Sequence, residues 1–168
     1  MLKNFKSGYA VSGSDQTAKG ETNDCVVRAI ANACDVNYNQ AHSYVADTFK
    51  RKKGEGTRMF MSTLDGISDM VFSDVGQLNM FNNGITRTLK PLGKGPKLGG
   101  TLVNPKYKHK PVAFTVKAFA QKYKRGNFIL AVNKHALAVN DGVVVDNGNY
   151  QFDGYRRVVE GAYQVQQA

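Results

Sequence analysis

The fold is decided by the stretch Thr22-Asn23-Asp24-Cys25-Val26-Val27-Arg28-Ala29-Ile30, which predicts the start of a buried helix. Asn23 and Asp24 are residue types that cap free backbone N–H groups at a helix N-terminus. The apolar residues that follow have the spacing of one buried helix face, and they are Val26, Ala29, Ile30 and Ala33. Cys25 therefore falls in or beside the first turn of this helix.

The position of Cys25 favours a reactive thiol. Unpaired N–H groups and the positive end of the helix dipole stabilise a thiolate, which is nucleophilic near neutral pH when a base is close. The alternative is a structural cysteine, because free cysteine is among the most buried residue types. The choice between the two depends on what the rest of the chain brings to Cys25.

Length and composition fit one mixed α and β domain over residues 1–168. The chain is 42% hydrophobic and 10% aromatic, has 17 glycines and shows no internal repeat. It contains no apolar run long enough to span a membrane, and no apolar signal segment follows its first residues. We therefore expect a cytoplasmic protein, or one packaged from the cytoplasm.

The sequence predicts neither a disulfide nor a metal site. Cys25 and Cys34 lie on one predicted helix, about 13 Å apart along its axis and on opposite faces, too far for an unstrained disulfide. The histidines, His42, His109 and His135, are scattered singly without the spacing of zinc ligands. No cofactor is expected.

The chain is strongly basic, with 23 Lys and Arg residues against 13 Asp and Glu residues and a formal net charge of +10. Its cations gather in three runs, namely Lys50-Arg51-Lys52-Lys53, Lys106-Tyr107-Lys108-His109-Lys110 and Lys122-Tyr123-Lys124-Arg125. Two runs contain tyrosines that can stack on bases, so nucleic acid is a candidate partner. Alternatively, each run ends a helix or fills a loop, where cations suit the helix dipole and solvent.

Apolar and turn-forming residues divide the chain into four parts. We expect an irregular lead-in over 1–21, helices over 22–72, a loop-rich segment over 73–111, and strands with one short helix over 112–168. Within the loop-rich segment, only residues 85–89 alternate like a short strand.

Local signals mark where the helices begin. Asn37, with Gln40 three residues later, matches a capping box that opens a second amphipathic helix. A third helix is expected over 57–71. Thr115 is expected to cap a short helix that ends before Gly126.

The C-terminal part predicts a hairpin that brings His135 to Asp146. Asp141-Gly142 between β-rich flanks is a strong signal for a two-residue hairpin turn. Counting outward from this turn places His135 and Asp146 on one face as diagonal neighbours, about 7 Å apart at the backbone. A carboxylate there can hydrogen-bond the imidazole, orient it and stabilise its cation.

His135 is the favoured base among the histidines, although a hydrogen-bonded core histidine is the ordinary alternative. His42 falls mid-helix beside solvated residues, and His109 lies in a lysine run that disfavours its charged form. With Cys25 as nucleophile and Asp146 as orienter, His135 completes the set of groups that a cysteine hydrolase needs.

These residues resemble the papain-like cysteine peptidase superfamily, in which a cysteine opens an N-terminal helix, a histidine opens a strand, and an acid or amide lies on the next strand. The run Cys25-Val26-Val27-Arg28-Ala29 is also similar to the Cys-x-x-Arg-Ala pattern of ovarian-tumour-type deubiquitinases. Together with the stretches 126–130, 135–139 and 141–146, it resembles small papain-like proteins of tailed bacteriophages. The resemblance covers the Cys25 helix and residues 113–165, about half of the chain.

The resemblance implies an α+β, papain-like fold, with N-terminal helices that carry the nucleophile packed on a C-terminal antiparallel β-sheet. It implies a thiol protease of phage origin, a peptidase or isopeptidase with the triad Cys25, His135 and Asp146 acting through a thioester. The substrate would be a protein or peptide, such as a host protein. A phage-encoded enzyme would lie in the host cytoplasm or be packaged in the virion.

The oxyanion hole departs from the family pattern. Papain-like enzymes often have a glutamine six positions before the cysteine, where this chain has Lys19. The candidate donors are Gln16 and Asn23, with the backbone N–H of Cys25. Arg28 is expected to be a structural salt-bridge partner rather than a catalyst.

Two other classes of function fit the same residues. A non-catalytic basic binding protein, or pseudoenzyme, would keep the fold and hold nucleic acid or an acidic host protein, with salt-sensitive binding that survives Cys25→Ala. A cell-wall amidase or an acyltransferase would use the same triad, because transfer or hydrolysis depends on which acceptor reaches the thioester.

Overall fold

The computed structural model describes residues 5–7, 21–56, 77–78, 87–95, 102–146 and 156–167. In chain order these residues form β1 (Phe5–Ser7), α3 (Cys25–Cys34), α4 (Tyr38–Phe49), β2 (Gln77–Leu78), β3 (Arg87–Lys94), α6 (Val116–Lys122), β4 (Asn127–Val132), β5 (His135–Asn140), β6 (Val143–Asp146) and β7 (Gly161–Gln167). The third helix expected over 57–71 lies outside the described residues.

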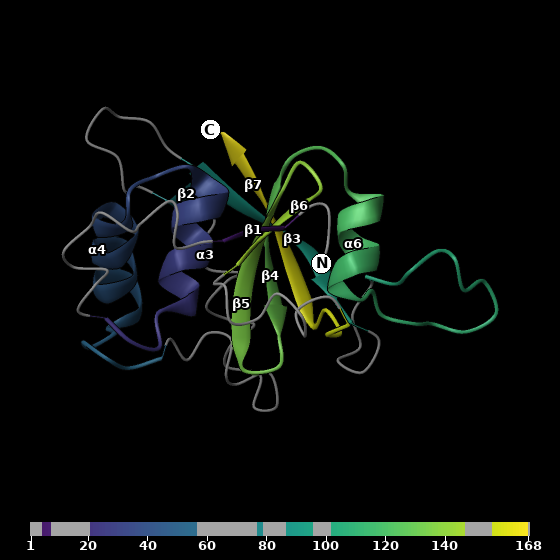
Figure 1. The fold of residues 1–168 in the computed structure, drawn as a ribbon, viewed down its shortest axis with the longest axis horizontal. Helices are drawn as coiled ribbons and strands as arrows, with labels where there is room; N and C mark the ends of the chain where they lie inside the picture. Colours follow the sequence, from purple (N-terminus) through teal and green to yellow (C-terminus); the bar gives the residue numbers. More distant parts are fainter. Residues whose placement is uncertain are drawn as a thin grey trace.

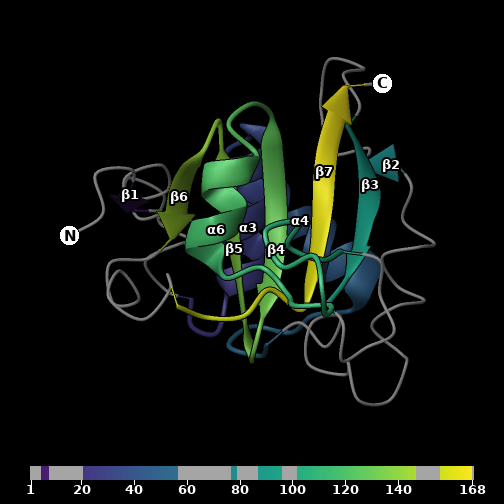
Figure 2. The ribbon, with the colours of Figure 1, turned by 90° about the vertical axis from the view of Figure 1, so that its right-hand side faces the viewer.

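The described strands form one seven-stranded sheet in the order β1-β6-β5-β4-β7-β3-β2. Neighbouring strands are antiparallel except β1 and β6, which are parallel. Helices α3 and α4 lie on one side of the sheet, with α3 next to the strands, and α6 lies on the other side (Figures 1 and 2). The chain is therefore an α+β protein in which one helix layer carries Cys25.

The position of β4 between two helix layers explains why its sequence is continuously apolar. Ile129 and Ala131 belong to the core cluster that includes α3, whereas Phe128 and Leu130 belong to the cluster that includes α6. Because helices cover both faces of this strand, every position from Phe128 to Val132 is buried.

The predicted caps of α4 and α6 and the predicted hairpin turn are confirmed, whereas neither Asn23 nor Asp24 caps α3 with its side chain. The Asn37 side chain accepts from the N–H of Gln40, whose own side chain reaches back to the N–H of Asn37. Thr115 caps α6 by accepting from Ala118. Residues 141 and 142 form the turn between β5 and β6 with φ of 48° and 78°, so the predicted hairpin forms with its predicted turn.

Two expectations are wrong because long-range pairing overrides local pattern. The lead-in over 1–21 contains β1, which pairs with β6 at the sheet edge. The segment after residue 89 continues as β3 to Lys94 and pairs with β7. A register shift between Pro91 and Gly93 accommodates the proline, and Gly93 adopts a φ of 126° that suits glycine. The sheet therefore also draws strands from the N-terminal and middle parts of the chain.

Candidate active site

Cys25 is the first residue of α3. The preceding residue, Asp24, occupies the N-cap position, but its side chain makes no capping hydrogen bond. The Asp24 carboxylate instead accepts from the Tyr38 hydroxyl at 2.7 Å and pairs with Nε of Arg28 at 2.9 Å. The Arg28 guanidinium lies 5.2 Å from the centre of the Tyr38 ring. Arg28 is thus the structural ion-pair partner that the sequence predicted.

The segment leading into Cys25 is tied down by the carboxylate of Glu21. Its oxygens contact Arg51 at 2.8 Å and His42 at 3.0 Å, and one accepts the Gly54 N–H at 3.2 Å. Arg51 also donates to the carbonyl of Thr22. Burial raises the pKa of Glu21, but the hydrogen bonds from Arg51, Gly54 and His42 outweigh it and hold the pKa at about 2. His42, a rival candidate base, therefore serves this Glu21 cluster.

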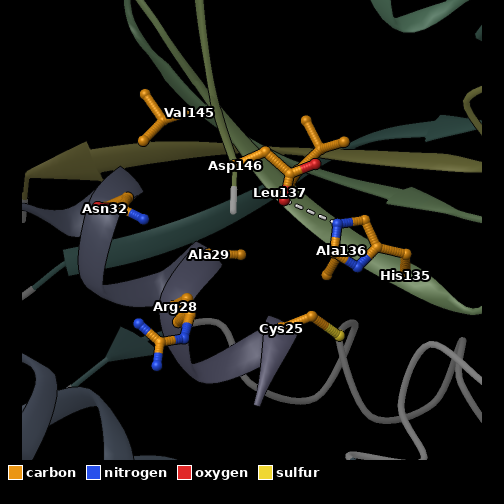
Figure 3. Close-up of a pocket in the computed structure, with 9 residues that line it drawn as sticks. All are labelled: Cys25, Arg28, Ala29, Asn32, His135, Ala136, Leu137, Val145 and Asp146. Carbon is orange, nitrogen blue, oxygen red and sulfur yellow. Dashed lines mark hydrogen bonds and ion pairs between the residues drawn. The ribbon is translucent and has the colours of Figure 1, made fainter. Parts of the chain in front are cut away.

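His135 and Asp146 form a buried pair at the end of the hairpin remote from its turn. Nε2 of His135 lies 2.8 Å from Oδ1 of Asp146, and both side chains are 4% exposed. Figure 3 shows the ring of His135 between Asp146 and Cys25, with the sulfur of Cys25 on the side of the helix that faces the ring. Because Asp146 occupies Nε2, the other ring nitrogen is left for the thiol.

The environment of His135 favours its cationic form. Burial lowers its pKa, but hydrogen bonds to Asp146 and to the Cys25 side chain, with the charges of both groups, raise it to about 9. The imidazole is therefore protonated near neutral pH. Three residues selected from sequence, Cys25, His135 and Asp146, are brought together in the structure.

Two asparagines that the sequence analysis did not single out fix the opposite end of α3. Nδ2 of Asn140 donates to the carbonyl of Asn32 at 2.8 Å, and Nδ2 of Asn127 donates to the carbonyl of Ala33 at 2.9 Å. Asn127 and Asn140 are paired across β4 and β5. Since helix-end carbonyls lack partners within the helix, these amides join α3 to the sheet.

This attachment sets the direction of α3. The end of the helix is held where β5 ends, so its first residue, Cys25, lies where β5 begins, at His135. The available signal was an asparagine at position 127, before the apolar run 128–132, and another at position 140, after the apolar run 136–139. Without the fold, nothing connected these amides to a helix about a hundred residues earlier.

The structure describes two of the three candidate oxyanion donors, the Asn23 side chain and the backbone N–H of Cys25. Nδ2 of Asn23 donates to the carbonyl of Gly54 at 3.0 Å, and Asn23 adopts a φ of 53°. This side-chain amide is thus engaged with the turn after α4. Gln16 lies outside the described residues. The third candidate, the backbone N–H of Cys25, lies at the start of α3.

A small cavity of about 10 Å³ adjoins the three residues, which is the space of about one water molecule. It lies between the first turns of α3 and the ends of β5 and β6 (Figure 3). Its walls are Cys25, Arg28, Ala29, Asn32, His135, Ala136, Leu137, Val145 and Asp146.

The second cysteine has the opposite environment. Cys34 is 1% exposed, and burial raises the pKa of its thiol to about 12 despite the opposing charge of Arg87. Both cysteines are free thiols. Cys34 is therefore an internal reference for a cysteine that is merely part of the core.

No family model, curated protein or solved structure matches the chain. The class of protein is therefore defined by the fold and the site, as an α+β protein with a helix-start cysteine beside a buried histidine–aspartate pair. Among the described residues, no group of three or more His, Cys, Asp and Glu side chains could hold a metal ion. In the same part of the chain, no helix has both the length and the apolar character needed to cross a membrane.

Proposed function

We propose that the protein is a cysteine hydrolase of the papain-like type, a peptidase or isopeptidase that cleaves amide bonds through a thioester. The observation that carries the proposal is the buried His135–Asp146 pair beside Cys25 at the start of α3. A nucleophile, a proton carrier and an orienting carboxylate are the groups that this chemistry needs.

In the acylation step, the Cys25 thiolate attacks the carbonyl carbon of the substrate and forms a C–S bond. The C–N bond then breaks, and the proton held by the His135 imidazolium goes to the leaving amine. Negative charge on the carbonyl oxygen is stabilised by the Cys25 backbone N–H and the positive end of the α3 dipole.

In the deacylation step, neutral His135 takes a proton from water as the water oxygen attacks the thioester carbon. The C–S bond breaks, the carboxylic acid leaves, and the thiolate–imidazolium pair is restored. If an amine reaches the thioester before water, the same steps give acyl transfer. Asp146 acts through His135 in this scheme and is a positioning residue.

The test begins with thiol reactivity, because it needs no substrate. The native protein is treated with limiting iodoacetamide near pH 6, and labelling of Cys25 and Cys34 is followed by mass spectrometry. We expect rapid, selective labelling of Cys25 that collapses in His135→Ala and His135→Gln. The glutamine variant keeps a polar side chain of similar reach, and circular dichroism checks that each variant folds.

A second stage identifies the bond that is cleaved. Peptide, isopeptide and cell-wall substrates are compared between wild type and Cys25→Ala, with an added amine to intercept the thioester. Cleavage that requires Cys25 supports the proposal, and the substrate that reacts separates peptidase from amidase. Slow labelling of Cys25 that is indifferent to His135 substitution would overturn it and favour a non-catalytic binding protein.

A further inference from the structure

The positive charge of the chain is concentrated in its middle. Between Val75 and Asn140 lie 12 of the 23 Lys and Arg residues and none of the 13 Asp and Glu residues. The rest of the chain holds the other 11 cations and all 13 anions, so its formal charge is slightly negative. This one stretch therefore accounts for the whole net positive charge of +10, and its local electrostatic field attracts polyanions.

Among the described residues of this stretch, the most exposed part is a closed loop between Asn104 and Val112. The N–H of Asn104 donates to the carbonyl of Val112 at 2.8 Å and closes the base of the loop. The side chain of Asn104 accepts from the N–H of Lys106 at 3.1 Å, and its carbonyl accepts from the N–H of Tyr107. Prolines 105 and 111 restrict the backbone at both ends, so less conformational entropy is lost when a ligand binds.

The side chains between these prolines alternate cations with aromatic rings, and all of them are exposed: Lys106, Tyr107, Lys108, His109 and Lys110. Tyr107 is 46% exposed, so its ring is open to a ligand. Helix α6 adds exposed cations at Lys117 and Lys122, and the residues just after it add Lys124 and Arg125. An acid in the described part of the chain, Asp141, lies nearby, since its turn packs against the end of α6.

We propose that this loop, residues 105–111, with the exposed cations in and just after α6, is a binding site for single-stranded nucleic acid. The lysines would contact successive phosphates, while Tyr107 stacks on an unpaired base. An acidic peptide would satisfy the lysines but offer no flat face to the ring. A duplex would offer phosphates but keep its base faces stacked.

The proposed site lies on the other side of the sheet from Cys25. In Figure 1 the loop extends beyond α6, away from α3 and α4, and in Figure 2 the loop and α6 lie together in front of the sheet. A bound strand would thus leave the start of α3 accessible. The inference does not depend on the proposed hydrolase activity, and Cys25→Ala is expected to bind as well as wild type.

The experiment measures fluorescence anisotropy of labelled oligothymidylate with the full chain over a series of salt concentrations. We expect Tyr107→Ala to weaken binding roughly 5-fold or more, the loss expected for one stacked base, and Tyr107→Phe to bind like wild type. The double variant Lys106→Ala/Lys108→Ala should reduce the slope of log affinity against log salt by about 1.4, or about 0.7 for each lost phosphate contact.

The matched control is Lys52→Ala/Lys53→Ala, which removes two exposed cations beyond the end of α4. We expect it to change the affinity much less than the loop variant. Equal losses in the two double variants would show attraction by net charge alone and overturn the proposal. Unchanged binding in Tyr107→Ala would also overturn it. The same holds if polyglutamate, anionic vesicles or a DNA duplex bind as tightly as the oligothymidylate.

Discussion

Nε2 of His135 and Oδ1 of Asp146 lie 2.8 Å apart, although both side chains are almost completely removed from solvent. A buried charged pair is costly unless its hydrogen bonds are well made. In this structure the pair is joined on its other side to Cys25, which raises the pKa of His135 further. Two interactions of His135, with Asp146 and with Cys25, therefore stabilise the imidazolium, and each can be removed separately.

Asp146→Asn tests the first link. The amide has nearly the shape of the carboxylate but lacks its charge, so the pKa of His135 should fall and the imidazolium be less populated. We expect the step in the pH profile of Cys25 alkylation that reports loss of the imidazolium to move at least about one pH unit lower, for a pKa lowered by one unit. Rates are read by mass spectrometry across a pH series.

The control for this substitution is Asp141→Asn, the same chemical change at an exposed turn residue with a φ of 48° that asparagine tolerates. It should leave the alkylation profile of Cys25 unchanged. A profile that responds equally to both substitutions would contradict a specific role for Asp146.

The stability of the protein should depend on the protonation of His135. Its folded-state pKa, about 9, is above the value of about 6.5 expected in the unfolded chain. The resulting stabilisation is fully present below pH 6.5 and is lost as the pH rises through 9. Relative to His135→Gln, wild type should lose up to about 3 kcal/mol over this range. Urea unfolding at each pH measures the difference, and a constant difference would contradict the expectation.

Asn140→Asp should destabilise the attachment of α3 to the sheet. The substitution removes the amide that donates to the Asn32 carbonyl and places a carboxylate beside the negative end of the helix dipole. We expect a loss of about 1–3 kcal/mol in unfolding free energy, greater than for Asn140→Ala. Asn133→Asp, at the exposed turn between β4 and β5, is the control and should have little effect.

The alkylation rate of Cys25 gives a second readout for Asn140→Asp. If α3 is held in place by this amide, the variant should label Cys25 more slowly even where it remains fully folded. Loss of stability with unchanged labelling would mean that Asn140 supports the fold without setting the position of the cysteine.

Glu21→Gln tests the cluster that holds the segment before Cys25. The folded-state pKa of Glu21, about 2, is below its ordinary value of 4.5. The stabilisation is therefore present above pH 4.5 and is lost as the pH falls through 2. At neutral pH the variant should be less stable by about 1–3 kcal/mol, as for a buried hydrogen bond to a charged group.

Thermal or urea unfolding from pH 7 to pH 2 should show the difference between wild type and Glu21→Gln shrinking over the acid part of the range. Glu55→Gln, an exposed residue on the neighbouring turn, is the matched control. A difference that persists unchanged at pH 2 would contradict the assignment to the charge of Glu21.

Local patterns were enough for much of the C-terminal site. Asp141-Gly142 specifies a two-residue turn, and a turn of known length fixes the register of the strands on both sides. The register brings His135 to Asp146. The start of α3 likewise followed from the spacing of its apolar residues, which placed Cys25 at the helix N-terminus.

Other features could not be read from local patterns. The strand from Arg87 to Lys94 contains proline and glycines that signal a loop, and it forms because β7 is available to pair with it. The role of Asp24 also changed, since the fold offers it Tyr38 and Arg28 in place of the helix N–H groups. In each case the deciding partner comes from another element.

The helix that begins at Cys25 and the hairpin that pairs His135 with Asp146 thus follow from local sequence, because both depend on residues close together in the chain. The meeting of these two units depends on the whole fold. Their approach depends on amide hydrogen bonds from Asn127 and Asn140 to α3 across separations of 94 and 108 residues. The packing of α3 against the sheet also holds the helix and the hairpin together. Contacts between residues so far apart in the chain leave no periodic pattern in the sequence, so they can be recognised only in the folded structure.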